Sequence, residues 1–542
     1  MSQPVRSSRW PWYAVPAFLV YALGYFAGAL TGDALLYVGG AVVALVILAP
    51  VWAKQPRYLL IGLVIYLPIE DAILQAFTAH VTIERVVPDA LLLLAFCLRL
   101  PLARLRRERV FGTPLDLPIA LILLVAGGSF VYNHIAVSVA AGGVYVLLRY
   151  VLVFYLAASS RFTERDVRVF VLMIVAVAIL QCVVGAVEFV LLHFAGLYLF
   201  NFDLVQGTTG YFNVLGMYLA IACIMALACY SPTWITHPTT RLALLVGASS
   251  AVIILALSRQ SLASLAIGWI VIAIFGRRYW PLRMSQLGTV AVAGAAVVAA
   301  SALLTVVSPA VLSGTTSTAR QSPVSTNSSG TEGPHSTVTV TPKPTSASKA
   351  YDTAAKGKGK QFNPGNLLSP DFYKNSRLYE IVNGGEAVLQ QSPLVGLGPG
   401  TFGGQATFHD QAFYDRLNVG LLLSDPKHTY VSDVEWMTIF GQLGLLGLLG
   451  FVAIFVQIWR LAYRAFKTSG QEMTRRLALA TMALVLVWIV VGFTGPNFEL
   501  RPVSIWIWIL PGMLWSLLRQ ERQVAKDERV VAAMRGPTTF PG

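Results

Sequence analysis

The chain has 542 residues, of which 56% are hydrophobic and only 12% are charged, and its mean hydropathy is +0.65. A soluble domain cannot bury that much apolar surface, so the composition excludes an ordinary soluble enzyme and favours a polytopic membrane protein. The net charge of +14 does not indicate nucleic-acid binding, because the basic residues cluster in short connections between apolar segments. The four cysteines all lie in apolar runs, so they imply no disulfide framework.

Apolar segments follow one another along most of the chain. Since about 20 apolar residues cross a hydrocarbon core of roughly 30 Å, we expect an all-α polytopic protein with about 12–14 transmembrane helices. The first segment follows Arg6 and Arg9 and is interpreted as a retained helix, because no clear signal-peptide cleavage site follows it. Acidic residues interrupt the third and fourth segments, and either could be re-entrant. The expected spans lie near 12–30, 34–52, 57–77, 85–100, 115–132, 143–160, 167–192, 211–230, 241–257, 260–276, 285–307, 431–458, 477–495 and 503–518.

The charges on the connections predict the orientation. Counted from a cytoplasmic N-terminus, the inner connections carry most of the lysines and arginines, and the outer ones carry few. This pattern predicts a multi-pass protein of the cytoplasmic membrane with both termini in the cytoplasm and a large polar loop outside. The expected parts are eleven helices in 1–308, a loop in 309–430, three helices in 431–518 and a cytoplasmic tail in 519–542.

A few arginines depart from this pattern. Arg259 falls in the tight turn between the ninth and tenth spans, on the outer side, and Arg149 lies within the sixth span. Arg501 lies near the outer surface beside Glu499. An arginine in a span costs at least a few kcal/mol, so it usually faces a partner or a wet cavity. Guanidinium groups match phosphate geometry, so these arginines are candidates for holding an anion.

The polar loop divides into two parts. Between Ser313 and Lys349, 18 of 37 residues are Ser or Thr, so residues 309–362 are expected to be a disordered insert. Residues 363–430 are expected to fold, with a helix that starts after Ser369, carries Arg377 and ends near Gln391. We expect this folded part to lie over the outer ends of the spans and partly close a cavity.

A glycine run in the folded part contains Gly396, Gly398 and Gly400. A dinucleotide site would need a preceding strand, a following helix and cytoplasmic access, so that interpretation fails. The run predicts a tight turn with positive φ, whose backbone N–H groups could still point toward a phosphate.

Titratable residues mark the end of the loop. His428 lies just before the twelfth span, where an imidazole could act as a general base, donate to a phosphate oxygen, or have no such role. Asp433 and Glu435 lie just inside the span, where carboxylates pair with arginine or border a cavity. No cluster of His, Cys and carboxylate residues has clear metal-ligand spacing, so no metal or cofactor is expected.

Four segments of the chain together resemble the O-antigen ligase and O-antigen polymerase superfamily of membrane glycosyltransferases. The resemblance covers most of residues 140–460, with the segments in order around one large outer loop. They are Gly207 to Leu219 with Asn213; Ser258-Arg259-Gln260-Ser261; Arg377 followed by residues 393–398 and Phe402; and His428 ahead of residues 441–447.

The resemblance implies a GT-C-like fold and transfer of a glycan from a polyprenyl-diphosphate carrier, usually undecaprenyl diphosphate, to an acceptor outside the membrane. It implies an inverting mechanism without a metal, in which Arg259 and Arg377, with Arg149 as a further candidate, hold the diphosphate. His428 would then position or deprotonate the acceptor hydroxyl. His428 lies more than a helical turn further before Gly444 than is usual, and Asp433 takes the expected place, so either residue is a candidate base.

The expected partners are therefore the lipid-linked glycan, an acceptor glycan or lipid, and membrane lipids, with no nucleic acid. Whether the chain polymerises repeat units or ligates a finished glycan stays open. A transporter or lipid flippase is the rival from another class, and it would need polar groups along a whole path and internal repeats. A membrane scaffold whose basic residues bind only headgroups is a third possibility.

Overall fold

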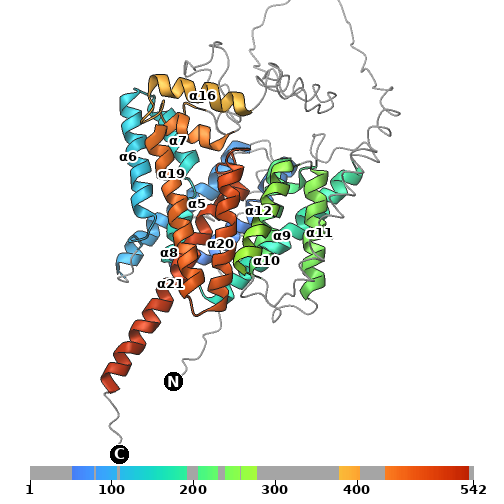
Figure 1. The fold of residues 1–542 in the computed structure, drawn as a ribbon, viewed down its shortest axis with the longest axis vertical. Helices are drawn as coiled ribbons and strands as arrows, with labels where there is room; N and C mark the ends of the chain where they lie inside the picture. The colour runs from blue at the N-terminus through green and yellow to red at the C-terminus, as the bar shows by residue number, and fades with distance from the viewer. Residues whose placement is uncertain are drawn as a thin grey trace, which may run out of the picture. The chain divides into compact units, whose positions relative to one another are not determined.

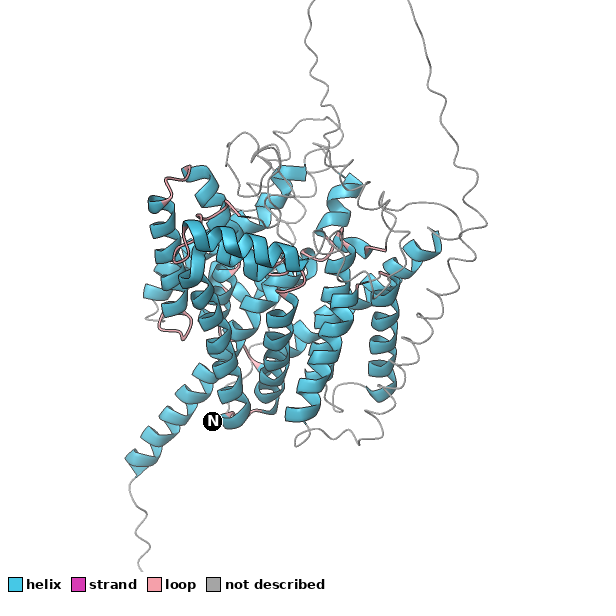
Figure 2. Ribbon diagram, turned by 45° about the horizontal axis from the view of Figure 1, so that its top comes forward, coloured by secondary structure: helices cyan, strands magenta, loops and turns pink. Residues whose placement is uncertain are grey.

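The computed structural model describes residues 52–77, 81–105, 110–191, 205–229, 238–256, 258–276, 377–402 and 434–535. Within these ranges the chain is helical and contains no strand (Figures 1 and 2), which confirms the all-α class. Almost all described residues belong to one compact unit, formed by residues 1–301 and 380–542. Residues 377–379 fall in a second unit, residues 302–379.

The described helices fall into two groups along the chain. The first group is α3 (Pro56–Tyr66), α4 (Glu70–Phe77), α5 (Val81–Leu105), α6 (Asp116–Tyr132), α7 (Val137–Leu148), α8 (Val151–Ser159) and α9 (Glu164–Val190). The second group is η2 (Gly207–Thr209), α10 (Phe212–Cys229), α11 (Pro238–Leu255), α12 (Arg259–Gly276), α16 (Arg377–Gln391), α19 (Glu435–Thr468), α20 (Glu472–Val491) and α21 (Arg501–Arg535).

Six helices in the described ranges are long and apolar enough to cross a membrane: α9, α10, α12, α19, α20 and α21. The pair α7 and α8, bent by 47°, forms a seventh candidate if it is one span. The chain is therefore a multi-pass membrane protein. The larger count of about 12–14 stays a prediction, because the spans expected near 12–30 and 285–307 lie outside the described residues.

The segment expected as a span near 57–77 is not one continuous helix. α3 ends at Tyr66 and α4 begins at Glu70, with Pro68 in the break. Proline lacks the N–H that a helix interior needs and its ring clashes with the preceding turn, so it separates the two helices. The next expected span, near 85–100, lies within α5, which contains Pro88 and Pro101.

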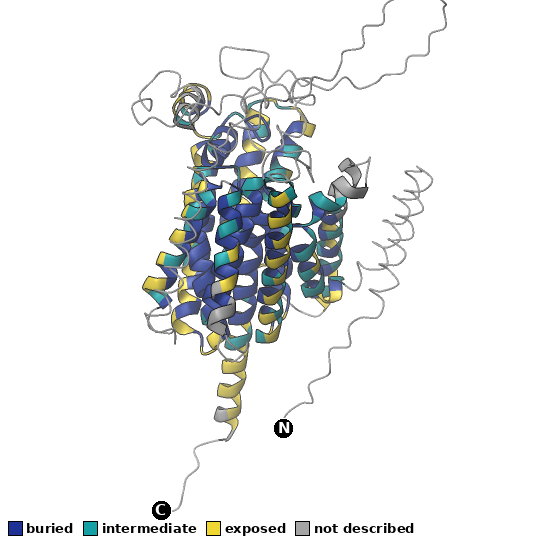
Figure 3. Ribbon diagram, turned by 90° about the vertical axis from the view of Figure 1, so that its right-hand side faces the viewer, coloured by how far each residue is buried: buried dark blue, intermediate teal, exposed yellow. Residues whose placement is uncertain are grey.

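The core is centred on α10, which is buried on every side from Val214 to Cys229. A helix that is apolar all round is stable only when other helices surround it. α9, α11, α12 and α20 pack against it, and the buried residues occupy the interior of this group (Figure 3). α9 is an outer helix, because the side chains of Leu172, Ile179, Val183 and Val187 are exposed along one side, as expected for a surface in lipid.

Two C-terminal helices run further than the sequence predicts. α19 continues to Thr468, ten residues beyond the expected end of its span at 458. α21 continues through Arg535 into the segment expected as a tail, and this extension is exposed (Figure 3). Both helices therefore extend past the apolar segment that would lie in the membrane.

Candidate functional site

Arg259 is the first residue of α12, and its side chain is exposed. It makes no hydrogen bond or ion pair with any residue that the structure describes. The residues on both sides of it are anchored. Ser258 Oγ donates to Asn213 Oδ1 at 3.2 Å, and Gln260 Oε1 accepts from Thr494 Oγ1 at 3.2 Å. The structure thus holds the backbone at Arg259 in place, and within the described ranges nothing pairs with its guanidinium.

α10 approaches the start of α12 closely at a glycine. A Cβ on Gly216 would lie 2.5 Å from Ser261 Oγ and 2.8 Å from Ser258 Cβ. Ser258 Oγ and Ser261 Oγ are themselves hydrogen-bonded at 2.6 Å. The resembling segments that contain Asn213 and Ser258 therefore meet in space, although they lie 45 residues apart.

The chain before α10 is fixed to the end of α9. Glu188 Oε2 accepts hydrogen bonds from the backbone N–H groups of Gln206 at 2.9 Å and Gly207 at 2.8 Å. The Gln181 side chain donates through Nε2 to the carbonyl of Pro68 at 3.0 Å and accepts through Oε1 from the N–H of Thr208 at 2.9 Å. These bonds set the position from which α10 starts, and so the position of Asn213.

Arg149 lies at the C-terminal end of α7, at the bend before α8. Its Nη2 donates to the carbonyl oxygen of Glu499 at 2.8 Å, and its guanidinium lies 5.6 Å from the ring centroids of Tyr145 and Tyr150. Glu499 belongs to the same short connection, residues 492–500, that contacts Gln260 through Thr494. Arg149 and Gln260, the residue after Arg259, therefore contact one connection between α20 and α21.

Arg501 has a different role. Its Nη1 lies 2.5 Å from Glu70 Oε1 and its Nη2 lies 2.6 Å from Asp89 Oδ2. The hydroxyl of Tyr145 also donates to Asp89 Oδ2. All three charged side chains are largely shielded from solvent, and buried charges are stable only when they are paired. Arg501 is thus paired with two carboxylates, so it is not available to hold a further anion.

Glu70 is the most buried member of this ion network. It begins α4, whose eight residues are too short to cross a membrane. Burial raises the pKa of the Glu70 carboxyl to about 7. Arg501 lowers this pKa but does not offset the burial, and the charges of Asp71 and Asp89 raise it further.

Several buried polar atoms around the 492–500 connection have no hydrogen-bond partner in the part of the chain that the structure describes. Glu435 is fully buried at the start of α19. Its Oε2 accepts from the N–H of Phe498 at 3.0 Å, while its Oε1 has no partner. Asn497 Oδ1 and Arg149 Nε are also without a partner. Such atoms are rare in folded proteins, and ordered water commonly completes their bonding. Asn497 is the residue here that sequence reasoning missed, and no sequence motif pointed to it.

The glycine run folds as a turn. Gly396, Gly398 and Gly400 have φ of 72°, 113° and 80°, values that residues with a side chain rarely adopt. A Cβ on Gly400 would lie 2.4 Å from the carbonyl oxygen of Val139 on α7. The turn therefore packs its backbone directly against a neighbouring helix.

The turn is also inserted into a break in α19. Gly444 has φ 63° and ψ −164° inside the helix. The N–H groups of Leu445 and Leu446 donate to the carbonyls of Pro393 at 2.9 Å and Leu394 at 3.1 Å instead of to their own helix. A Cβ on Gly444 would lie 2.5 Å from Leu394 O and from Gly396 N. We call this arrangement of residues 393–402 against residues 441–446 the glycine clasp.

The N–H groups of the glycine run, residues 396–400, bond within the protein. Those of Leu397 and Gly398 donate to the carbonyls of Gly441 at 2.8 Å and Gln442 at 3.0 Å. Gly400 N donates to Gln442 Oε1 at 2.9 Å, Gly396 N donates to a preceding carbonyl, and Pro399 has no N–H. The N–H groups of the run are thus already bonded to Ser392, Gly441 and Gln442, so none of them is free to point toward a phosphate.

Three predicted site residues are not placed by the structure. His428 and Asp433 lie outside the described residues. Arg377 is the first residue of α16 but falls in the second unit, and its side chain is not described. Their roles stay predictions. Within the described ranges, no group of three or more His, Cys, Asp or Glu residues is arranged to hold a metal ion.

Comparison with protein-family models found no match, and a search of curated proteins found none with significant similarity.

Proposed function

We propose that the chain is a membrane glycosyltransferase of the O-antigen ligase or polymerase type, acting on a glycan carried by a polyprenyl diphosphate. The acceptor hydroxyl oxygen attacks the anomeric carbon and forms a new C–O bond. The bond between that carbon and the diphosphate breaks, and the polyprenyl diphosphate leaves. The acceptor proton passes to a base, and the configuration at the anomeric carbon is inverted.

The proposal depends on the exposure of the Arg259 side chain and on its lack of a partner among the described residues. Ser258 and Gln260 fix the backbone on both sides of it. A cation that no described residue neutralises suits a diphosphate, whose leaving oxygen gains negative charge in the transition state. Arg149 contacts the 492–500 connection, to which Gln260 also bonds.

The other roles follow from the motifs. Arg377 would hold the second phosphate, and His428 or Asp433 would accept the proton of the acceptor hydroxyl. The charge pattern of the connections places this chemistry outside the cytoplasm, with both termini inside. No metal takes part in the proposed reaction.

The direct test is transfer by the purified chain in nanodiscs. The chain is mixed with a polyprenyl-diphosphate oligosaccharide and an acceptor glycan, and both the transferred glycan and the released carrier are measured. Arg259→Gln is expected to lower transfer by a factor of roughly 10²–10³, the usual effect of removing one group that stabilises developing charge. Arg464→Gln removes an exposed arginine from the far end of α19 and serves as the matched control.

Wild-type chain that releases no carrier with any acceptor would contradict the proposal. Equal activity of the two variants would show that Arg259 does not hold the diphosphate.

A second candidate function is transport or flipping of the lipid-linked glycan. The paired charges of Glu70, Arg501 and Asp89 favour it, because ionisable groups within a helical bundle often line translocation paths. Liposomes with a fluorescent polyprenyl-diphosphate lipid distinguish the two functions. A flippase moves the label between leaflets without consuming it, whereas a transferase releases the carrier.

A further inference from the structure

α16 has an exposed apolar side. Val382 is 46% exposed and Leu389 is 61% exposed, and Leu394, just after the helix, is 57% exposed. Val382 and Leu389 lie seven residues apart, about two turns of an α-helix, so their side chains project from the same side. A contiguous exposed apolar surface often marks a contact with a membrane or a protein. The proposed transfer reaction gives these three residues no role.

The buried side of α16 packs on α19. Val388 is fully buried, and Gly384, one turn before it, is buried as well. A Cβ on Gly384 would lie 2.9 Å from Phe402 Cζ and 3.4 Å from Met437 Cε on α19. Residues 380–391 of α16 belong to the same compact unit as α19, so this packing fixes which side of α16 faces outward.

The exposed polar side of α16 lies elsewhere on the helix. Gln390 Nε2 donates to Glu386 Oε1 at 3.1 Å, and both side chains are exposed. With 3.6 residues per turn, Val382 and Leu389 lie between this polar side and the buried side. A helix at a membrane interface has such an exposed apolar side, which enters the boundary of the acyl chains while the polar side stays in water.

α19 presents an apolar face to the surrounding lipid. Its exposed apolar side chains follow one another at intervals of three, four or seven residues, so they share one face of the helix. We call these residues the lipid-facing stripe: Leu445, Leu449, Val452, Val456 and Tyr463. An exposed apolar face on a helix long enough to cross a membrane contacts acyl chains.

The length of the stripe indicates where the membrane begins and ends on α19. Leu445 and Tyr463 are separated by about 27 Å along the helix, close to the roughly 30 Å of a hydrocarbon core. Lys467 Nζ lies 5.6 Å from the ring centroid of Tyr463. Aromatic and basic residues mark membrane interfaces, so Tyr463 lies at one boundary of the core and Leu445 lies near the other.

Leu394 joins the stripe to α16. The N–H of Leu446 donates to the carbonyl of Leu394 at 3.1 Å, so the two residues lie at the same end of α19. α16 ends at Gln391, just before Leu394, and it lies across this end of the bundle (Figure 1). The exposed apolar side of α16 therefore begins where the lipid-facing stripe ends.

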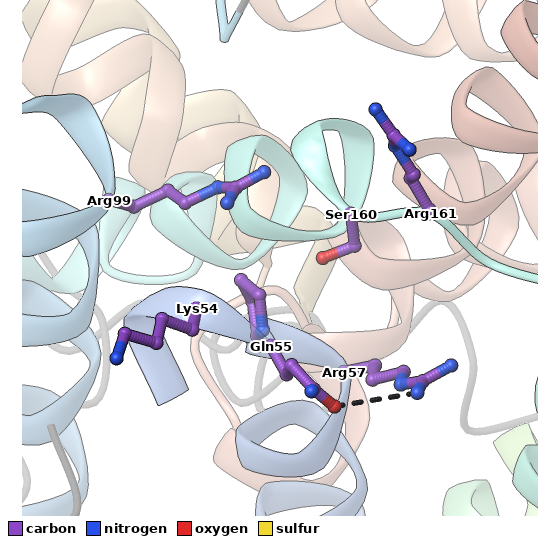
Figure 4. A pocket seen from close by; sticks show the side chains of 7 residues that line it. Lys54, Gln55, Arg57, Arg99, Ser160 and Arg161 are labelled. Atoms are coloured by element: carbon purple, nitrogen blue, oxygen red, sulfur yellow. Dashed lines mark hydrogen bonds between the residues drawn. The ribbon is translucent and has the colours of Figure 1, made fainter. Parts of the chain in front are cut away.

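The other end of the bundle is basic. The residues that line a pocket there include Lys54, Arg57, Arg99 and Arg161 (Figure 4). Ser469, which follows α19, donates through Oγ to Glu521 Oε1 at 2.6 Å. The neighbouring Gln520 donates through Nε2 to the carbonyl of Phe162 at 2.8 Å, so the end of α19 and the basic residues belong together. Positive residues are retained in the cytoplasm, which predicts that α16 is at the outer leaflet.

We propose that α16 is an interfacial helix, whose residues Val382 and Leu389, with Leu394, enter the outer leaflet between the headgroups and the acyl chains. Such helices bury their apolar side about 5–10 Å into this boundary. The contact holds α16 at the level of the headgroups, where the diphosphate of a lipid-linked glycan also lies. It does not depend on whether the chain transfers a glycan.

The test places a nitroxide at single cysteines in a chain whose four native cysteines are replaced by alanine, in phosphatidylcholine liposomes. Leu389→Cys and Leu394→Cys report on the apolar side, and Gln390→Cys is the matched control on the polar side. Power-saturation EPR compares collisions with O2, which concentrates in the membrane, and with Ni(II)EDDA, which stays in water. Each position is exposed, so the variants are expected to fold, and thermal unfolding is measured in parallel. Val382→Cys replaces a variant that is less stable than its parent.

The ratio of O2 to Ni(II)EDDA collisions is expected to be several-fold higher at Leu389 and Leu394 than at Gln390. Leu449→Cys on the lipid-facing stripe gives the value for full contact with lipid. Ratios at Leu389 and Leu394 equal to that at Gln390 would overturn the proposal, because the apolar side would then be in water. Few collisions with either reagent would also overturn it, because another part of the chain or a second copy would then cover α16.

Discussion

The side chain of Gln442 on α19 accepts a hydrogen bond from the backbone N–H of Gly400 at 2.9 Å. Its Nε2 donates to the carbonyl of Phe402 at the same distance. Gln442 is buried, so neither backbone group would find water in its absence. One side chain therefore holds the glycine clasp against the helix that follows the polar loop.

Gln442→Ala is expected to lower the free energy of unfolding by about 2–4 kcal/mol, because it leaves two buried backbone groups unsatisfied. Thermal unfolding in detergent, followed by tryptophan fluorescence, measures the change. Gln390→Ala removes an exposed glutamine that bonds only to Glu386 and is expected to change stability little. A similar loss in both variants would show that the Gln442 bonds are not the cause.

Gly444→Ala is expected to destabilise the protein by about 3 kcal/mol or more. A side chain at positive φ costs roughly 1–2 kcal/mol, and the added Cβ would press on Leu394 and Gly396 at 2.5 Å. Overpacking of this kind costs about 1–3 kcal/mol. Gly128→Ala on α6 is the control, because nothing lies within 4 Å of a Cβ there and the helix gains a better helix former. A Gly444 variant as stable as the wild type would mean that the break in α19 is not required.

The sequence predicted the helical class and most helix positions, because long apolar runs leave a chain few alternatives in a membrane. It also predicted a turn at Gly396, Gly398 and Gly400. It could not predict where the turn docks. The turn docks at the break at Gly444 in α19. The local sequence there predicts an uninterrupted helix, so the positive φ of Gly444 depends on tertiary contacts.

The candidate site shows the same division. The sequence singled out Arg259 and Arg149 because they depart from the positive-inside distribution of the connections. The contacts of Gln260 and Arg149 with the 492–500 connection join residues 234 and 350 positions apart, which no local pattern encodes. Arg501 stood out for the same reason, but its partners Glu70 and Asp89 lie more than 400 residues away, so its structural role was not visible.

Glu70 is expected to make stability depend on pH. Its carboxyl has a pKa of about 7 in the folded chain against 4.5 as the ordinary value, so the folded state binds more protons between these two pH values. The contribution of this group is therefore largest below pH 4.5 and is lost as the pH rises to about 7. Glu70→Gln cannot ionise and keeps an oxygen that can accept from Arg501, so its unfolding temperature should fall less over this range.

The measurement is the unfolding temperature of the wild type and the variant across that pH range. Glu386→Gln, at an exposed position on α16, is the control and should follow the wild type. Curves for Glu70→Gln and wild type that stay parallel would show that Glu70 does not titrate in this window.

The predicted orientation can be tested with single cysteines in a chain whose four native cysteines have been replaced. Gln390→Cys places a thiol at an exposed position of α16, and Arg165→Cys places one at the exposed start of α9. Positive residues are retained in the cytoplasm, and Arg165 lies in a connection with Arg161 and Arg168, so its thiol should be inside. A membrane-impermeant maleimide is then expected to label Gln390→Cys in intact cells and Arg165→Cys only after the membrane is opened. The reverse pattern would place Arg149 and Arg259 on the cytoplasmic side, where a transferase that acts at the outer face could not use them.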